Sequence, residues 1–230
     1  MNERQKQVHE QIKQNLIVSC QALADEPLHS PTIMGRMAIA AKEGGAKAIR
    51  ANSIADIREI KQQVDLPIIG LMKADFDDSA VFITPREKEV DLLYQEGVDI
   101  IATDATNRIR PGGKTLEEFF IRVRKKYPNQ LFMADCASFE EAEEAEKLGF
   151  DYIGTTLHGY TEETKGASLP NMELLDKMIT NLSTPVIAEG GIWTPDQLKQ
   201  ALKLGAHSVV VGSAITRPQE ITKRFVQTIK

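Results

Sequence analysis

The sequence lacks several features that define other classes of protein. Its 230 residues include two cysteines, Cys20 and Cys136, too few for a disulfide framework and without the spacing of zinc ligands. No segment approaches the ~20 apolar residues of a membrane-spanning helix, which excludes an integral membrane protein. Lysine and arginine form no block and the formal net charge is −5, so nothing indicates a nucleic-acid partner. Residues 1–6 are polar and lack the apolar run of a signal peptide, so we expect a cytoplasmic protein.

The sequence does contain a regular alternation of two kinds of segment. Eight short apolar runs recur along the chain, and each is followed by a segment with the pattern of an amphipathic helix. Most runs are continuously apolar rather than alternating, as expected of parallel strands that are buried on both faces. Their polar ends lie 21 to 33 residues apart, about the length of one strand–helix unit. The runs are residues 16–20, 48–51, 67–73, 100–104, 131–135, 152–156, 185–189 and 208–212.

The segments between the runs carry the start and stop signals of helices. Ser138 opens a capping box with Glu141, and Thr194 precedes a proline at the first helical position. Eight such units without a linker predict a single α/β domain over residues 1–230 with a (β/α)8 TIM-barrel fold. The rival fold, an open doubly wound sheet, would show a glycine-rich fingerprint after its first strand, and residues 18–23 have none.

Polar side chains stand where the apolar runs stop. In a barrel of this kind the carboxyl ends of all strands converge on one mouth, and active sites lie there. A charged residue directly after several apolar ones is costly in an interior, so a group of them at one mouth favours a functional site over structural ion pairs. These residues are Ser19, Gln21, Arg50, Asn52, Lys73, Asp104, Asp135, His158 and Glu189.

Two glycine-containing turns predict a phosphate site. Gly190-Gly191 follows the seventh run, and Gly212-Ser213 follows the eighth. Glycines at these turns let backbone N–H groups approach an anion, and the loops after strands seven and eight are the usual phosphate site of the barrel. The pattern predicts a phosphorylated small molecule as ligand and leaves the reaction open, because many barrels share it.

Lys73 and Glu189 are the candidate catalytic residues. A lysine and a glutamate that face one carbon atom from opposite sides can remove a proton beside a carbonyl group and return it on the other face, which inverts that carbon. Arg50, Asn52 or Lys73 itself could stabilise the enolate that forms. Lys73 could instead form a Schiff base, as in an aldolase, and the spacing does not separate these reactions. The enzyme alternative is therefore another phosphosugar barrel, either a Schiff-base aldolase or a different epimerase. A non-catalytic phosphosugar-binding sensor is a further alternative, but it would have no use for an acid/base pair.

Six segments together resemble the N-acylglucosamine-6-phosphate 2-epimerase family. Its most specific motifs are Ser19-Cys20-Gln21-Ala22 and His158-Gly159-Tyr160-Thr161, and the resemblance extends from residue 16 to about residue 216. The resemblance implies an enzyme that converts N-acetylmannosamine 6-phosphate to N-acetylglucosamine 6-phosphate by inverting C2, in the bacterial use of sialic acid. The segments are residues 17–23, 49–53, 69–73, 134–138, 154–161 and 188–192.

The resemblance also implies roles for individual residues. Lys73 and Glu189 would be the acid/base residues. The backbone at Gly190-Gly191 and Gly212-Ser213 would hold the phosphate group. The family uses neither a metal nor an organic cofactor, and its members are often homodimers. The implied substrate contacts are Gln21, Arg50 and Asp135.

Several other residues have both a functional and a structural interpretation. Asn52 and His158 are further candidate substrate-binding residues, although a hydrogen-bonded structural role for His158 is the alternative. Residues 107–114 are polar and rich in glycine, so they form either a mobile lid at the mouth or a solvated loop. Cys20 and Cys136 have no evident partner base, so we expect them to pack in the interior rather than act as nucleophiles.

Overall fold

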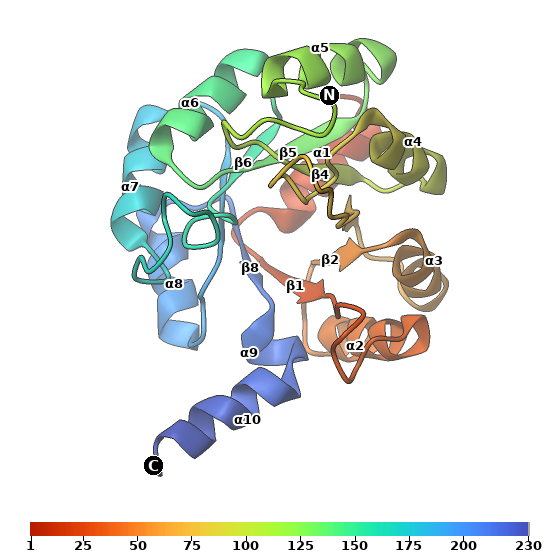
Figure 1. Cartoon of the computed structure of the whole chain (residues 1–230). Helices are drawn as coiled ribbons and strands as arrows, with labels where there is room; N and C mark the ends of the chain where they lie inside the picture. Colours follow the sequence, from red (N-terminus) through yellow and green to blue (C-terminus); the bar gives the residue numbers. More distant parts are fainter. Residues whose placement is uncertain (230) are drawn as a thin grey trace.

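The computed structural model describes residues 1–229, and residue 230, at the end of the expected domain, lies outside them. The described residues form a closed barrel of eight strands with helices around its outside (Figure 1). The strands are β1 (Leu16–Cys20), β2 (Ala48–Asn52), β3 (Ile68–Leu71), β4 (Ile100–Asp104), β5 (Leu131–Asp135), β6 (Tyr152–Gly154), β7 (Val186–Glu189) and β8 (Ser208–Val211). The helices are α1 (Glu3–Ile12), α2 (Pro31–Glu43), α3 (Ile54–Gln63), α4 (Glu87–Glu96), α5 (Leu116–Lys126), α6 (Phe139–Leu148), α7 (Met172–Asn181), α8 (Pro195–Leu204), α9 (Ser213–Thr216) and α10 (Pro218–Gln227). Within residues 1–229 no helix has both the length and the apolar character needed to cross a bilayer.

The strands follow one another around the barrel in chain order. Each strand pairs in parallel with the next, and β8 pairs with β1, which closes the ring. The predicted (β/α)8 barrel is therefore confirmed, and the open doubly wound sheet is excluded. In a ring of eight, strands four positions apart lie on opposite sides, so β3 faces β7 and β1 faces β5 across the mouth.

Two strands end earlier than their apolar runs predict. β3 ends at Leu71 and β6 at Gly154. β3 and β4 share only two paired positions and then diverge. Beyond this point the backbone of Met72 and Lys73 pairs with residues 82–84 of the following loop rather than with β4. The apolar run continues past the strand because it then packs against this loop.

The helices begin and end at the predicted signals. Ser138 Oγ accepts a hydrogen bond from the Glu141 amide at 3.2 Å, and a Glu141 carboxylate oxygen accepts one from the Ser138 amide at 3.1 Å. Thr194 Oγ1 accepts a bond from the Gln197 amide at 3.2 Å in the same way. These side chains satisfy amide groups that the first helical turn leaves without partners, which fixes where α6 and α8 begin.

Apolar residues form one buried cluster on each side of the sheet. The outer cluster lies between the strands and the surrounding helices, and the inner cluster fills the barrel. Val8 and Ile12 of α1 belong to the inner cluster, and their exposed fractions are 1% and 0%. Helix α1 therefore closes the amino end of the barrel, and the site lies at the carboxyl end.

The last helix departs from the regular pattern. The short helix α9 follows β8 directly, and α10 then extends away from the barrel rather than along it (Figure 1). No residue of α10 is buried in the described chain. Its apolar side chains Phe225 and Val226 are 73% and 39% exposed.

Candidate active site

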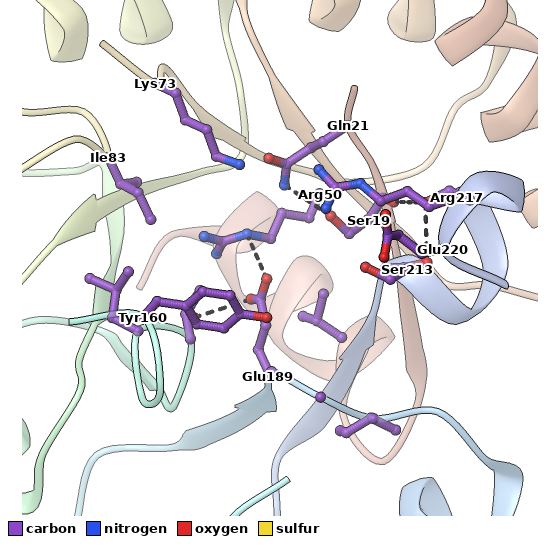
Figure 2. A pocket seen from close by; sticks show the side chains of 18 of the residues that line it. Ser19, Gln21, Arg50, Lys73, Ile83, Tyr160, Glu189, Ser213, Arg217 and Glu220 are labelled. Atoms are coloured by element: carbon purple, nitrogen blue, oxygen red, sulfur yellow. Dashed lines mark hydrogen bonds and ion pairs between the residues drawn. The ribbon is translucent and has the colours of Figure 1, made fainter. Parts of the chain in front are cut away.

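A cavity of about 430 Å³ opens at the carboxyl end of the barrel. Its walls come from the ends of β1, β2, β3, β6, β7 and β8, from residues 82–83 and from the α9–α10 junction. Figure 2 shows the polar side chains of the walls converging on its centre. The volume suits a small phosphorylated molecule, because ligand pockets typically measure about 300–1,000 Å³.

Arg50, at the end of β2, is the buried cation beside the cavity. Its side chain is 1% exposed, and Nη2 donates a 2.6 Å hydrogen bond to Oδ2 of Asp135 on β5. Its Nε lies 3.2 Å from Oε1 of Glu189. This second contact is an ion pair rather than a hydrogen bond, because the Nε–H group has no aligned acceptor among the described residues. Arg50 thus neutralises two carboxylates and keeps one donor for a ligand.

Glu189 is held rigidly at the end of β7. The Thr155 hydroxyl donates to its backbone carbonyl at 2.7 Å and accepts from its backbone amide at 3.0 Å. Thr156 Oγ1 lies 3.3 Å from Oε2 of Glu189, and it donates a shorter bond of 2.6 Å to Asp135. Burial raises the pKa of Glu189 to about 7; Arg50 opposes this shift and Asp135 adds to it.

Lys73 follows β3 and extends into the cavity (Figure 2). Its backbone amide donates to Oδ1 of Asn52 at 2.8 Å, which fixes the point where the side chain leaves the backbone. Burial lowers the pKa of Lys73 to about 8, and the cations Arg217 and Arg50 add to this effect. Because β3 and β7 lie on opposite sides of the ring, Lys73 and Glu189 reach the cavity from opposite walls.

Gln21 adds a second polar atom without a protein partner. Its Nε2 donates to Ser19 Oγ at 2.9 Å, whereas its Oε1 is buried and accepts no hydrogen bond from any described residue. Buried polar atoms are nearly always paired in native proteins. Gln21 and Arg50 both line the cavity, so these two unpaired atoms are candidates for hydrogen bonds to a bound polar molecule.

The two glycine turns follow β7 and β8 at the mouth. Gly190 and Gly191 adopt φ values of 109° and 67°, and a Cβ at position 191 would lie 2.3 Å from the Cβ of Leu169. Only glycine fits there. Gly212 precedes α9, whose first amide groups have no partner within the helix. Arg217 reaches the same part of the cavity and forms a 3.1 Å ion pair with Glu26.

The structure brings most of the predicted site residues together and places four behind the wall. Asn52, Asp104, Asp135 and His158 are not among the lining residues, and Asp104 is buried in a 2.7 Å ion pair with Arg108. Asn52 holds the Lys73 backbone, and Asp135 pairs with Arg50. The two ring nitrogens of His158 lie 2.8 Å from the Ala137 carbonyl oxygen and 2.9 Å from Asn171 Nδ2. These contacts support the structural alternative for His158. The lining residues that were predicted are Ser19, Gln21, Arg50, Lys73, Glu189, Gly190, Gly191, Gly212 and Ser213.

Sequence reasoning missed several polar side chains of the cavity, among them Thr156, Tyr160 and Arg217. Thr156 stands at the end of the sixth apolar run. A polar residue is common at such a position, so it is not by itself a signal of a functional site. Tyr160 belongs to the motif that carries the family resemblance, which was the available signal. Arg217 follows no strand, and nothing in its local sequence marks it as a site residue.

The remaining polar and thiol groups have structural settings. Cys20 and Cys136 are both fully buried, and burial raises the pKa of each thiol, to about 12 for Cys20, so the expected packing role is confirmed. The segment 107–114 is not a fully solvated loop, because Arg110 within it is 1% exposed. Within residues 1–229, no three His, Cys, Asp or Glu side chains are grouped as a metal ion would require.

Fold and site together place the chain among the TIM-barrel proteins that bind small molecules at the carboxyl ends of their strands. A family model described as "Putative N-acetylmannosamine-6-phosphate epimerase" matches residues 34–230, and the chain belongs to this family. A relative from Enterobacter sp. (strain 638), described as "Putative N-acetylmannosamine-6-phosphate 2-epimerase", is 57% identical over 98% of this chain and 97% of its own length. A Listeria welshimeri relative with the same description is 52% identical over 97% of this chain and 95% of its own length.

Solved structures agree with this placement. The N-acetylmannosamine-6-phosphate 2-epimerase from Clostridium perfringens superposes with a TM-score of 0.92 and 54% identity, over 96% of this chain and 95% of that one. A thiamine phosphate pyrophosphorylase from Pyrococcus furiosus superposes with a TM-score of 0.59 and 22% identity, over 96% of this chain and 98% of that one. The second similarity shows the shared barrel fold alone.

Proposed function

We propose that this protein is an isomerase that interconverts N-acetylmannosamine 6-phosphate and N-acetylglucosamine 6-phosphate by moving a proton at C2. The observation that carries the proposal is the pair Lys73 and Glu189. They enter one cavity from opposite strands, and the pKa of each is shifted toward neutrality, to about 8 and about 7. Family membership supports the choice of substrate, because the relatives are named for this sugar phosphate.

The chemistry begins with the open-chain sugar, whose C2 lies beside the C1 aldehyde. One of the two side chains removes the C2 proton, and the electron pair of the C–H bond moves toward the aldehyde oxygen to form an enolate. The unpaired Arg50 Nε–H and a protonated Lys73 are the donors available to stabilise this negative charge. The other side chain then delivers a proton to the opposite face of C2. No redox change occurs, and the two epimers differ only in the configuration at C2.

The shifted pKa values suit this reaction in both directions. Each direction needs one member of the pair protonated and the other deprotonated, with the roles exchanged. Between a free lysine and a free glutamic acid, moving the proton from the ammonium to the carboxylate is unfavourable by a factor of about 10⁶. Here burial lowers the pKa of Lys73 and raises the pKa of Glu189, so this penalty is far smaller. Both protonation states are therefore accessible.

The glycine turns and Arg217 would hold the phosphate group. Backbone amides at Gly191 and Ser213, and the Arg217 guanidinium, offer donors and positive charge on one side of the cavity. These phosphate contacts are remote from C2. The binding energy of the phosphate group therefore serves to orient the reacting carbon between Lys73 and Glu189. In this assignment Asn52 and Asp135 position Lys73 and Arg50 rather than contact the sugar.

The test is proton NMR of N-acetylmannosamine 6-phosphate with the purified protein in D₂O. We expect the gluco epimer to form with deuterium at C2, since both side chains exchange protons with solvent. An epimer without deuterium would favour a single shielded proton and would contradict the two-residue scheme. Cleavage of the sugar, together with a Lys73 adduct trapped by borohydride, would favour the aldolase alternative, and no conversion at all would refute the function.

A bell-shaped pH dependence of kcat/KM follows from the shifted groups. The active pair carries one proton, so the rate falls below about pH 7, where Glu189 and Lys73 are both protonated, and above about pH 8, where both are deprotonated. Initial rates across this range measure the two limbs. The second ionisation of the substrate phosphate, near pH 6, is measured separately by ³¹P NMR. A rate that keeps rising beyond about pH 9 would show that neutral Lys73 acts alone.

The proposed setting is a cytoplasmic homodimer with one phosphosugar-binding domain per chain. Free buried thiols at Cys20 and Cys136 are compatible with a reducing compartment. Phe225 on α10 is 73% exposed and Ile229, just after this helix, is 83% exposed. These uncovered apolar side chains support a second copy as partner, because such surface is costly in water.

Charging this apolar surface should separate the dimer. We expect Phe225→Glu to lower the molar mass measured by light scattering from two chains to one, while Ile121→Glu leaves it unchanged. Ile121 is a matched control because it is 55% exposed on α5, far along the chain from α10. A wild-type protein that is monomeric at every concentration would refute the dimer.

A further inference from the structure

Lys73 lies on a piece of backbone that no regular strand supports. β3 has ended at Leu71, and β3 and β4 have diverged. The loop residues 82–84 fill the gap between them at the mouth. The Ala74 amide donates to the Phe82 carbonyl at 3.0 Å, and Lys73 and Ile83 form an antiparallel bridge. The position of Lys73 therefore depends on where residues 82–84 lie, as well as on the contact of its backbone amide with Asn52.

Thr84 is the point at which this loop is fastened. Its φ is +46°, a left-handed conformation that is strained for a β-branched residue. Its amide donates to the Met72 carbonyl at 2.7 Å, and its hydroxyl accepts from the Met72 amide at 3.2 Å. The same hydroxyl donates to the Ala102 carbonyl on β4 at 2.7 Å. Thr84 thus bridges the end of β3 to β4, in a conformation that its surroundings must enforce.

Arg110 supplies the remaining bonds. Its Nη2 donates to the Thr84 carbonyl at 2.9 Å and to Thr103 Oγ1 at 2.7 Å. Its Nε donates to the Pro85 carbonyl at 3.0 Å, and its Nη1 to the Asp104 carbonyl at 2.6 Å. The guanidinium also lies 3.9 Å from the centre of the Phe119 ring, and the residue is 1% exposed. One buried side chain therefore joins the loop 82–85 to the end of β4.

Its buried position makes Arg110 hard to replace. Burial lowers the pKa of this guanidinium to about 10, with Asp104 opposing the shift, so it stays charged at neutral pH. A planar fork with several donors in fixed directions can satisfy four acceptors at once, and no other side chain can do this.

We propose that Arg110 is a positioning residue for the epimerisation, fixing Lys73 through the backbone of residues 82–85. This inference rests on the proposed function, because it assigns the effect to the catalytic lysine. Arg110 itself does not line the cavity, so it acts only through the loop. Small displacements of a reacting group are costly, about 10²-fold for 1 Å, which gives the scale of the effect.

The experiment compares Arg110→Met and Arg110→Lys with the control Arg124→Met. Arg124 resembles Arg110 in its contacts, donating to the Gln130 and Gly149 carbonyls at 2.7 and 2.8 Å and lying 4.9 Å from the Phe132 ring. It belongs to α5, and its partners Gln130 and Gly149 stand just before β5 and just after α6, at the opposite end of the barrel from Lys73. Arg124 also pairs with Asp151 at 2.7 Å and its side chain is 26% exposed, so its loss removes a comparable set of contacts from a less buried place without touching Lys73.

We expect the Arg110 variants to lower kcat by about 10- to 100-fold while KM stays within about threefold. The basic limb of the pH profile should move to higher pH, because a loosened Lys73 is better hydrated and its pKa rises toward that of a free lysine. Hydrogen exchange at the amides of Met72, Ala74 and Thr84 should accelerate. Arg124→Met should change none of these three readouts. If Arg110→Met does not fold, the same three readouts are measured on Arg110→Lys.

Two results would overturn the proposal. One is a wild-type kcat and pH profile in a folded Arg110 variant. The other is an equal loss in Arg124→Met, which would show a general effect of stability. Failure of the proposed function is recognised separately, since the wild-type protein would then convert neither epimer of the sugar phosphate. In that case accelerated hydrogen exchange would still show that Arg110 fixes the loop, and unchanged exchange would refute that as well.

Discussion

Glu189→Gln should lower kcat by about three orders of magnitude and leave KM within a few-fold of wild type. Glutamine has the shape of glutamate and preserves the contact with Thr156, but it can neither take nor give a proton at C2. Arg50 would still be paired with Asp135 at 2.6 Å, so the cavity should keep its form. Rates from the NMR assay with each epimer as substrate measure the effect.

The two-residue scheme predicts a second, more specific result for the Glu189→Gln variant. Lys73 remains in Glu189→Gln, so the epimer whose C2 proton faces Lys73 should still exchange that proton with D₂O, without being converted. Lys73→Met should show the mirror result, with exchange of the other epimer only. Exchange of both epimers by one variant would show that a single residue serves both faces. Near-normal turnover in Glu189→Gln would remove this residue from the chemistry.

Arg50→Met should cost about 3–5 kcal/mol of stability and eliminate measurable activity. The methionine leaves Asp135, whose side chain is 0% exposed, and Glu189, 13% exposed, without their shared cation. Removing one partner of a buried ion pair leaves an uncompensated charge, which is the reason for the large cost. The enolate would also lose the Nε–H donor proposed for it.

The stability loss in Arg50→Met should grow as the pH rises. Arg50 lowers the pKa of Glu189, so without it this pKa lies above the value of about 7 found in the wild-type site. A carboxyl group whose pKa is raised by folding stabilises the fold fully below its unfolded pKa, near 4.3, and this contribution is lost as the pH rises through the folded value.

Urea unfolding at about pH 5 and about pH 8.5 therefore tests the electrostatic origin of the loss. The control is Arg58→Met, which removes a surface ion pair with Glu96 in which the arginine side chain is 61% exposed. This control should change stability little at either pH, because exposed ion pairs are screened by water. An Arg50→Met deficit that is the same at both pH values would contradict the electrostatic explanation.

Much of the site could be predicted because the relevant signal is local. A polar residue that ends an apolar run must lie at the mouth of a parallel barrel, and this placed Lys73, Arg50 and Glu189 correctly. The same signal does not predict which side chains line the cavity and which bond to other protein groups. Asp135 and Asn52 are at the mouth as predicted, yet they bond to protein groups behind the cavity wall.

Residues that act through long-range packing gave no such signal. Arg217 comes from the α9–α10 junction, and Arg110 from a polar segment that reads as a loop. The burial of Arg110 depends on four acceptors that come from β4 and from the loop after β3. The direction of α10, away from the barrel, could not be predicted either, because its sequence has the ordinary pattern of an amphipathic helix.

The sequence by itself determined the barrel, the mouth where chemistry takes place and the types of side chain found there. It could do so because strand–helix periodicity, caps and the return of polarity at strand ends are properties of neighbouring residues. Only the tertiary structure decided that Lys73 and Glu189 stand on opposite walls of one cavity with Arg50 beside them. It also set their pKa values near neutrality, because burial and the field of other charges arise only when segments far apart in the chain come together.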